Sequence, residues 1–437
     1  MRDRDTIYAV ASGQGKAAIK VLRISGAAAL DVSSCLGLQP LHARTAALRK
    51  IVHPATGEQI DKGLALWFSH PHSYTGEDLL EIHFHGGRAV QAALLAACAT
   101  IPDCRMAEPG EFTWRAFLNG KMDLTAVEGL SDLLEANTEL QRRQALLQVE
   151  GSLFERAAEW RSKLVLCLGL LESSIDFEDE PDVPKSVAEG AAKVLTELVC
   201  DLDKALGDHR RGEIMREGLQ VIIAGPPNAG KSSLLNCLAK RDIAIVTPEP
   251  GTTRDLLEVA LDLHGSPVVL VDTAGLRETE DPAEAIGVAR AEARAHAADL
   301  ILWLSPSLET DEPMLAVELR SKVVVIRSKA DLSASAPLQH LAVSSVTGEG
   351  IDGLFAMLAG RAEEAFGKEP ALITRERHRS AISRAAERLR GIDLRSGGVE
   401  CIAEEVAEAT RDLEALCGRV GADEILGEIF SRFCIGK

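Results

Sequence analysis

Apolar and polar residues alternate in short runs along the first hundred positions of the chain. Residues 19–24, 63–68 and 79–84 are rich in aliphatic side chains and are bounded by glycine or proline turns, which is typical of strands. Residues 90–99 instead carry apolar side chains at helical spacing. We therefore predict a small α+β domain over residues 1–118.

The hydrophobic period changes near residue 120 and becomes that of helices. Leu124, Val127, Leu130 and Leu134 share one helical face, and stretches rich in Ala, Leu, Glu, Gln and Arg follow. An acidic segment containing prolines, residues 175–184, interrupts this pattern. Residues 119–215 are predicted to form several long helices with a break at that segment.

Strand and helix patterns alternate again from about residue 216. The strand candidates are residues 221–224, 256–263, 268–271, 300–304, 323–326 and 341–343. All but 256–263 are nearly continuous apolar runs, typical of buried parallel strands, whereas 256–263 alternates like a half-exposed edge strand. Helical spacing resumes near residue 375 and continues to the end. We predict an α/β domain at 216–373, inserted into a helical domain formed by residues 119–215 and 374–437.

A phosphate-loop motif follows the first strand candidate of that domain. Gly225-Pro-Pro-Asn-Ala-Gly-Lys-Ser232 matches G-x-x-x-x-G-K-[ST] and precedes a helical stretch. A strand, a glycine turn and a helix in this order aim backbone N–H groups and a positive helix end at one point, which suits nucleotide phosphates. Lys231 is predicted to reach the β and γ phosphates, and the Ser232 hydroxyl to hold Mg²⁺. The alternative, a chance glycine-rich turn, becomes weaker with each motif that follows.

Three further motifs fit a nucleotide switch. Gly251-Thr-Thr-Arg-Asp255 offers a threonine hydroxyl to Mg²⁺, with Thr253 as the predicted ligand, and Asp272-Thr-Ala-Gly275 stands at a strand end. Asp331, in Ser328-Lys-Ala-Asp331, can accept hydrogen bonds from guanine N1–H and N2–H, which adenine does not offer, so we predict GTP rather than ATP. Ser328 replaces the usual Asn, and Leu276 replaces the water-orienting Gln of Ras-type enzymes. The predicted GTP contacts are Asn228, Ala229, Gly230, Lys231, Ser232, Ser233, Thr247, Thr252, Thr253, Asp272, Thr273, Ala274, Gly275, Ser328, Lys329 and Asp331.

Composition narrows the class of protein. The 437 residues include 48 basic and 66 acidic side chains, a formal charge of -18, so a nucleic-acid partner would need a local basic patch or a second protein. The nine cysteines include no C-x-x-C pair, which argues against a disulfide framework or a zinc knuckle. No apolar run reaches the roughly 18 to 20 residues that span a bilayer, so we expect a cytoplasmic protein without a membrane partner. His83 and His85 lack a third ligand, so a structural role is favoured over metal binding.

Motifs along the whole chain give a more specific resemblance. They are Asp5-Thr-Ile, Val21-Leu-Arg-Ile-Ser-Gly26, Thr75-Gly-Glu-Asp-Leu-Leu-Glu81, His85-Gly-Gly87, Pro109-Gly-Glu-Phe112, Arg115-Ala-Phe-Leu-Asn-Gly-Lys121 and the terminal Phe433-Cys-Ile-Gly-Lys437. Together with the phosphate loop and the threonine motif, they resemble the tRNA-modification GTPases known as MnmE or TrmE. The resemblance implies a folate-binding N-terminal domain, a discontinuous helical domain and an inserted Ras-like P-loop GTPase domain.

The resemblance also implies how GTP would be hydrolysed without the Gln of Ras-type enzymes. Asn228 would hold a K⁺ ion together with the backbone carbonyls of Thr247, Glu249 and Thr252, and this ion would neutralise charge developing on the phosphates. Glu284 would orient the attacking water. The chain departs from the family where Pro248 and Pro250 stiffen the loop that carries these carbonyls.

A second site follows from the same resemblance. A tetrahydrofolate derivative, 5,10-methylene or 5-formyl, would bind across an N-terminal-domain dimer through Arg23, Glu81, Lys121 and Lys437. Cys434 would take part in catalysis. With the FAD-containing partner MnmG in a heterotetramer, the homodimer would install an aminomethyl or carboxymethylaminomethyl group at C5 of the tRNA wobble uridine. The alternative is a GTP-dependent RNA-binding or ribosome-assembly switch, for which neither flank is obviously basic.

Overall fold

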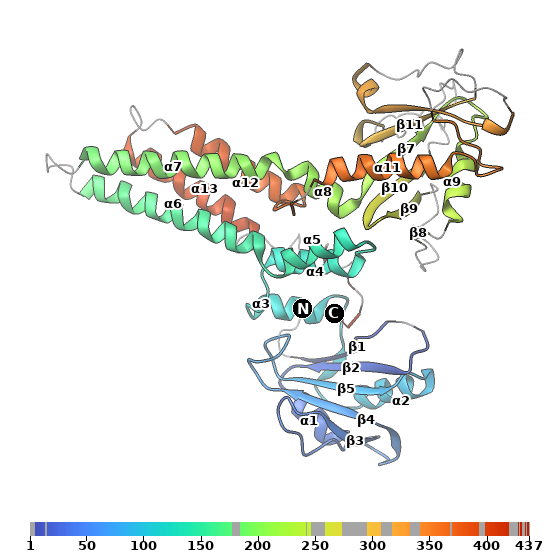
Figure 1. Ribbon diagram of the computed structural model, residues 1–437. Helices are drawn as coiled ribbons and strands as arrows, with labels where there is room; N and C mark the ends of the chain where they lie inside the picture. The colour runs from blue at the N-terminus through green and yellow to red at the C-terminus, as the bar shows by residue number, and fades with distance from the viewer. Residues whose placement is uncertain are drawn as a thin grey trace, which may run out of the picture. The chain divides into compact units, whose positions relative to one another are not determined.

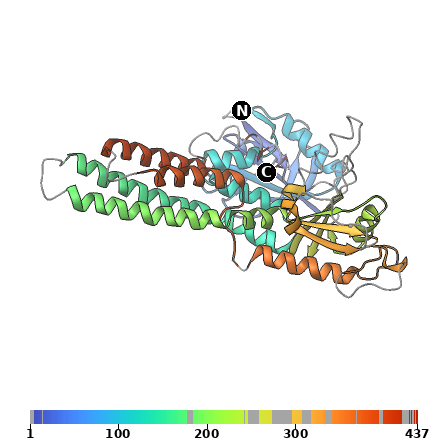
Figure 2. The ribbon, with the colours of Figure 1, turned by 90° about the horizontal axis from the view of Figure 1, so that it is seen from above.

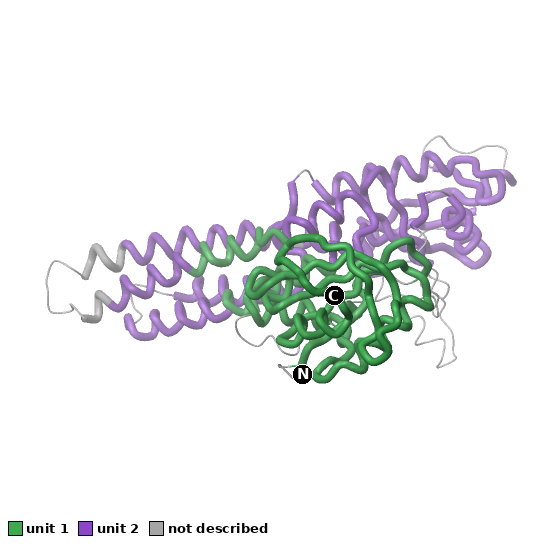
Figure 3. Tube along the Cα trace, turned by 90° about the horizontal axis from the view of Figure 1, so that it is seen from below, with its two compact units in different colours: residues 1–131, 149–161, 413–437 green, residues 132–148, 162–412 purple. Residues whose placement is uncertain are grey.

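The computed structural model divides into two compact units. Figure 3 colours residues 1–131, 149–161 and 413–437 as unit 1, and residues 132–148 and 162–412 as unit 2. Of the 437 residues, the structure describes 5–13, 15–176, 184–241, 243–245, 258–272, 295–306, 317–332, 341–367, 369–392, 398–418, 427, 429–430, 433 and 435–436.

Unit 1 is built on a mostly antiparallel sheet with strand order β3-β4-β5-β2-β1-β6 (Figure 1). Its β1–β6 pair is parallel. The predicted strands at 19–24, 63–68 and 79–84 are confirmed as β2, β4 and β5, whereas β1, β3 and β6 were not predicted. The strand bounds are β1 Thr6–Val10, β2 Ile19–Ser25, β3 Ala47–Val52, β4 Gln59–Phe68, β5 Leu79–His85 and β6 Cys104–Met106.

Helices cover one face of this sheet and part of the other. Helices α1 (Ala29–Cys35) and α2 (Arg88–Ala99), the second of which was predicted, pack on a core that includes Leu22, Ile82 and Phe84. On the opposite face, Phe112 of α3 (Glu111–Leu118) packs against Ile7 and Ala9 of β1. The remaining part of that face, over β3 and β4, presents exposed apolar side chains.

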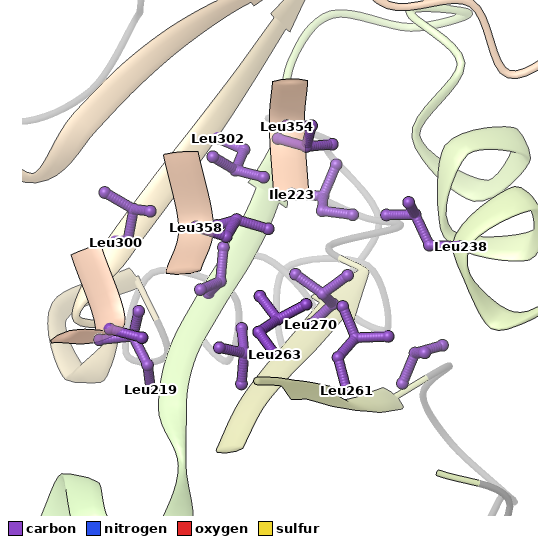
Figure 4. Packing of buried hydrophobic residues seen from close by; sticks show 14 of the residues in the cluster. Leu219, Ile223, Leu238, Leu261, Leu263, Leu270, Leu300, Leu302, Leu354 and Leu358 are labelled. Atoms are coloured by element: carbon purple, nitrogen blue, oxygen red, sulfur yellow. The ribbon is translucent and has the colours of Figure 1, made fainter. Parts of the chain in front are cut away.

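Unit 2 contains the second sheet, with strand order β12-β11-β7-β10-β9-β8. Strands β12, β11, β7 and β10 are parallel, β9 pairs with β10 in antiparallel orientation, and β8 pairs with β9 in antiparallel orientation. Leucines from these strands and from helices α9 and α11 fill the core shown in Figure 4. The bounds are β7 Leu219–Ala224, β8 Ala244–Ile245, β9 Glu258–Leu263, β10 Ser266–Asp272, β11 Leu300–Ser305, β12 Val323–Arg327, α9 Lys231–Ala239, α11 Ile351–Phe366, and the 3₁₀ turns η1 Val317–Lys322 and η2 Ala330–Leu332.

Two strand predictions need correction. The alternating strand is β9, but it is not an edge strand, because β8 pairs with it at Ala244 and Ile245. Residues 341–343 do not form a full strand, since Ala342 makes a single bridge to Arg327 of β12. The segment is too short to extend this ladder, because the next amide, that of Ser344, already bonds within the following turn.

The helical part was predicted in outline. Its helices are α4 Leu124–Glu135, α5 Glu139–Val149, α6 Ser152–Asp176, α7 Pro184–Gly207, α8 His209–Glu217, α12 Glu376–Arg390 and α13 Val399–Leu416, so the predicted break falls between α6 and α7. Within unit 2, α6, α7, α12 and α13 run side by side (Figures 1 and 2), with Lys163–Asp201 and Arg388–Asp412 ion pairs between neighbours. Among the described residues, no helix combines the length and apolar character that crossing a membrane would require.

Candidate functional site

The phosphate loop connects the buried strand β7 to the first turn of α9. Gly225 has φ 145°, and a side chain there would place its Cβ 2.3 Å from the Leu304 carbonyl oxygen, so glycine is required. Gly230 caps α9 in the left-handed region, with φ 95°. Asn228 is exposed at the turn, also with positive φ, a conformation that Asn tolerates better than most residues. The loop therefore has the shape that lets backbone N–H groups approach an anion.

The side chains of the last two residues of the loop motif are held by hydrogen bonds. The Lys231 ammonium donates to the carbonyl oxygens of Gly225 at 2.9 Å and Pro226 at 3.1 Å. The Ser232 hydroxyl donates to Asp272 Oδ2 at 2.6 Å, which joins the start of α9 to the end of β10. Asp272 is only 2% exposed, and its other oxygen has no hydrogen-bond partner in the structure. A buried carboxylate beside a hydroxyl, with an oxygen still available, suits a hard cation such as Mg²⁺.

The loop of residues 328–332, which holds the predicted guanine contacts, lies next to the phosphate loop. The Ser328 amide donates to the Ser305 carbonyl at the end of β11, and the Ala330 amide donates to the Val343 carbonyl. Asp331 Oδ1 accepts a hydrogen bond of 2.6 Å from the buried Ser344 hydroxyl, which orients the carboxylate. Ser328 is 5% exposed and its hydroxyl has no partner in the structure.

These loops line a common cavity of about 310 Å³. Its walls combine residues of the phosphate loop and the helix after it, residues of the 328–332 loop, and further residues from β11 and from the segment 343–346. They are Ala229, Gly230, Ser233, Leu234, Leu304, Ser328, Lys329, Asp331, Leu332, Val343, Ser345 and Val346. Six of the predicted GTP contacts therefore meet at one cavity. Several other predicted site residues lie outside the described residues, namely Thr247, Glu249, Thr252, Thr253, Thr273, Ala274, Gly275, Glu284, Cys434 and Lys437, as do Pro248, Pro250 and Leu276.

A second candidate site lies on the sheet of unit 1. Arg23 on β2 and Glu81 on β5 are direct cross-strand partners. Arg23 Nε and Nη2 donate to Glu81 Oε1 at 3.0 and 2.9 Å, and both side chains are 18% exposed. The guanidinium carbon of Arg23 also lies 4.9 Å from the Tyr74 ring centroid and 5.7 Å from that of Phe112. Arg23 is thus held on several sides by protein groups.

A cavity of about 350 Å³ opens beside this pair. It is lined by Arg44, Phe68, His72, Ser73, Tyr74, Leu79, Glu81 and Lys121. The structure therefore brings Glu81 and Lys121 to one cavity, whereas Arg23 is not among its lining residues. Arg44 was missed, because it is a non-glycine residue with φ 57° whose position depends on a bond from its Nη2 to the His72 carbonyl at 2.9 Å. Burial raises the pKa of Tyr74, although hydrogen bonding to Thr113 and the charge of Arg23 act in the opposite direction.

The histidine pair of β5 has a structural partner. His85 Nδ1 lies 2.8 Å from Asp61 Oδ1 on β4. Burial acts to raise the pKa of Asp61, but hydrogen bonds from the His85 amide and ring outweigh it, so the net pKa is lowered. No group of three or more His, Cys, Asp and Glu side chains among the described residues could hold a metal ion. His85 is thus held by Asp61 of the neighbouring strand.

The fold and this first site define a class of protein. A glycine loop between a parallel strand and a helix, next to an oriented aspartate in a loop that follows another parallel strand, is the arrangement of P-loop GTP-binding proteins.

Comparison with known proteins identifies the family. The model for the "GTP-binding protein TrmE N-terminus" matches residues 6–121, and that for the "MnmE helical domain" matches residues 124–434. The "tRNA modification GTPase MnmE" of Beijerinckia indica is 48% identical, with 99% of this chain and 96% of the relative covered. That of Methylobacterium radiotolerans is 46% identical, with 100% of both covered. The chain therefore belongs to the MnmE (TrmE) family of tRNA modification GTPases.

A solved structure resembles part of the chain. The G domain of the T. maritima FeoB iron transporter covers 33% of this chain and 98% of its own length, at 27% identity and a TM-score of 0.26. A TM-score this low supports no inference about the present protein.

Proposed function

We propose that this protein is a K⁺-dependent GTPase that acts with a FAD-containing partner and a tetrahydrofolate one-carbon donor. The group installed is an aminomethyl or carboxymethylaminomethyl substituent at C5 of the tRNA wobble uridine. The observation that carries the proposal is the cavity where phosphate-loop residues face the loop of Asp331. Family membership over the whole chain supplies the tRNA-modifying role.

The described residues fit a nucleotide with its metal ion. Backbone N–H groups around Gly230 and the Lys231 ammonium would bind the phosphates, and the Asp331 carboxylate would accept two hydrogen bonds from guanine. Ser232 would hold Mg²⁺, with Thr253, and the adjacent available oxygen of Asp272 supports a cation there. When bound, Mg²⁺ and K⁺ would neutralise charge on the phosphates during hydrolysis.

The residues proposed to promote hydrolysis are Asn228 and Glu284. Asn228 is exposed at the tip of the phosphate loop, where its side-chain oxygen is free to bind K⁺ with carbonyls of Thr247, Glu249 and Thr252. Glu284 would accept a hydrogen bond from the attacking water. Equal GTP turnover in K⁺ and in Na⁺ would refute the role of Asn228.

The cavity of unit 1 fits a folate in chemical terms. Glu81 can accept hydrogen bonds from pterin N–H groups, and Lys121 can pair with the glutamyl carboxylate. Because Arg23 donates twice to Glu81, its role in this structure is to fix that carboxylate, and a direct folate contact would require it to change partners. Lys437 and Cys434 are proposed to complete the site from the C-terminal tail.

The open part of the unit 1 sheet supports the proposed homodimer. Leu48 on β3 and Leu64 on β4 are direct neighbours in register and are 55% and 40% exposed. We infer that these leucines contribute to a contiguous apolar patch of the kind that another chain covers. MnmG would then complete a heterotetramer and contribute the tRNA surface that a chain of charge -18 needs. We expect this assembly to act in the cytoplasm.

Folate binding distinguishes this proposal from its alternative, a GTP-dependent RNA-binding or ribosome-assembly switch. Equilibrium binding of tritiated 5-formyl-tetrahydrofolate should be measured for the wild type, for Glu81→Gln and for Glu135→Gln, a control at an exposed position of α4. We expect binding to the wild type and the control, and a loss of about tenfold or more in Glu81→Gln. GTP binding without any folate binding would favour the alternative.

A further inference from the structure

We call residues 219–367 the nucleotide-binding domain. The short segment that leaves this domain is held by side chains of two helices. It covers residues 370–374, between α11 and α12. Gln144 on α5 makes two bonds to Ala371, donating to its carbonyl at 2.7 Å and accepting from its amide at 3.0 Å. Gln148, one turn further along α5, donates to the Leu372 carbonyl at 2.9 Å. Arg211 and Arg216 on α8 donate to the carbonyls of Pro370 and Thr374.

The chain that enters the same domain is bound by the same face of α5. Gln141 Nε2 donates to the Arg216 carbonyl at the end of α8 over 2.8 Å. Gln141, Gln144 and Gln148 are three and four positions apart, so they project from one side of the helix. We call these residues the glutamine clamp. Gln144 is 4% exposed and Gln148 2%, and a buried amide that lost its partners would remain desolvated, which makes the clamp costly to open.

The incoming and outgoing segments also touch each other directly. Gly212 lies inside α8, and a Cβ at this position would lie 1.8 Å from the Ile373 carbonyl oxygen. No side chain fits between the two backbones. The connection between the nucleotide-binding domain and the helices of unit 2 is therefore a closely packed joint and not a pair of independent flexible linkers.

The start of α5 makes a second contact with the nucleotide-binding domain. The Leu140 amide donates to the Gly265 carbonyl at 3.2 Å, and Leu140 packs against the core of that domain. Gly265 is in the tight turn between β9 and β10. At its other end, β10 finishes at Asp272, which accepts the hydrogen bond from Ser232 of the phosphate loop. One strand thus connects the proposed metal ligands to α5.

A cavity beside the glutamine clamp leaves room for α5 to move. A polar cavity of about 430 Å³ borders the glutamine clamp, with Asp132, Asn137, Gln220 and Thr374 in its wall. The Thr374 hydroxyl and Gln148 Oε1 are buried without hydrogen-bond partners in the structure. Close-packed contacts transmit displacement, whereas a polar cavity can absorb it. A shift of the hairpin at Gly265 would therefore move α5 about the clamp instead of straining a packed interface.

We propose that α5 is the helix that receives the nucleotide state, with the β9–β10 turn as its input and the glutamine clamp as its pivot. This inference rests on the proposed GTP switch, because it needs β10 to respond to the bound nucleotide. It assigns a conformational function to glutamines that do not line the proposed nucleotide cavity.

Hydrogen–deuterium exchange on the full-length protein tests this inference. The wild type, Gln144→Ala/Gln148→Ala and the control Arg143→Ala, at an exposed position of α5, would each be compared with GDP and with a non-hydrolysable GTP analogue. In the wild type and the control we expect exchange in α5 and residues 370–374 to differ between the two nucleotides. In the double variant, the Ala371 amide should exchange about tenfold faster, and the nucleotide-dependent difference should be confined to residues 219–367.

Two outcomes would overturn the inference. One is an α5 that does not respond to nucleotide in the wild type although both nucleotides bind, and the other is a response that persists in the double variant. Absence of nucleotide binding to the wild type would instead refute the proposed function. If the double variant fails to fold, Gln144→Met keeps a similar side-chain length without adding a charge and removes both hydrogen bonds to Ala371, and the same two outcomes apply to it.

Discussion

Asp331→Asn changes one carboxylate oxygen of the proposed base-reading loop, residues 328–332, to an NH₂ group. Asp331 Oδ1 is fixed by the Ser344 hydroxyl at 2.6 Å, and Ser344 is fully buried. An introduced amide satisfies Ser344 best with its own oxygen, which turns its NH₂ group toward the base. That group would face the N1–H and N2–H donors of guanine, so donors would oppose donors.

The size of the effect follows from the two bonds that are lost. Hydrogen bonds to a charged acceptor contribute roughly 1.5 to 3 kcal/mol each. Losing both corresponds to about 3 to 6 kcal/mol, or roughly a 10²-fold to 10⁴-fold increase in the Kd for GTP. Xanthine carries a carbonyl at C2 in place of the amino group, so xanthosine triphosphate should recover part of the lost affinity.

Fluorescent analogues of GTP and xanthosine triphosphate measure both affinities by titration. The wild type should prefer the guanine nucleotide and the Asp331→Asn variant the xanthine nucleotide. The matched control is Asp352→Asn, at an exposed position on the first turn of α11, which should keep the wild-type preference. A variant that binds GTP within about threefold of the wild type would refute the assignment of Asp331 as the guanine reader.

Three further predictions concern stability and catalysis. Gly212→Ala should lower the free energy of unfolding, measured by urea denaturation, by about 1 to 3 kcal/mol, because the new Cβ meets the Ile373 backbone carbonyl. The control Gly360→Ala, at an open helical position, should leave the free energy of unfolding equal or higher. Burial acts to raise the pKa of Glu111, but hydrogen bonds from Arg105 and other donors outweigh it, so the net pKa lies below 4.5. A carboxyl group whose pKa is lowered by folding stabilises the folded state above pH 4.5, and this contribution is lost as the pH falls through the pKa of the folded state. Glu111→Gln should therefore reduce the fall of the melting temperature with decreasing pH. An unchanged pH dependence of the melting temperature would contradict this. Replacing K⁺ with Na⁺ should cut GTP turnover while leaving GTP affinity nearly unchanged, as measured by phosphate release and titration.

Residue patterns predicted the parts of the fold that rest on local signals. Strands β7, β10 and β12 each combine an apolar run with a characteristic motif at the end of the strand, and both are properties of consecutive residues. Strand β3, Ala47–Val52, was missed because it carries Arg49 and Lys50 and owes its conformation to pairing with β4. Tertiary pairing of this kind overrides local preference.

The nucleotide site and the site of unit 1 also differ in how far local sequence patterns predicted them. The cavity around Asp331 was predictable in part, because Ala229 and Gly230 belong to one short motif and Ser328, Lys329 and Asp331 to another. The partnership of Arg23 with Glu81 was not, since it depends on the register between strands 58 residues apart. The glutamine clamp had no sequence signal, because Gln141, Gln144 and Gln148 look like ordinary exposed positions of a polar helix until the chain that they bind is known.

Nucleoside analysis of tRNA tests the central claim most directly. Bulk tRNA from cells lacking the gene would be digested and analysed by mass spectrometry, with wild-type protein or Glu284→Ala supplied from a plasmid. We predict that the C5 aminomethyl or carboxymethylaminomethyl substituent of the wobble uridine disappears in the deletion strain. The wild type should restore it, and Glu284→Ala should not, although it still binds GTP. Wobble uridines that keep the substituent in the deletion strain would contradict the account.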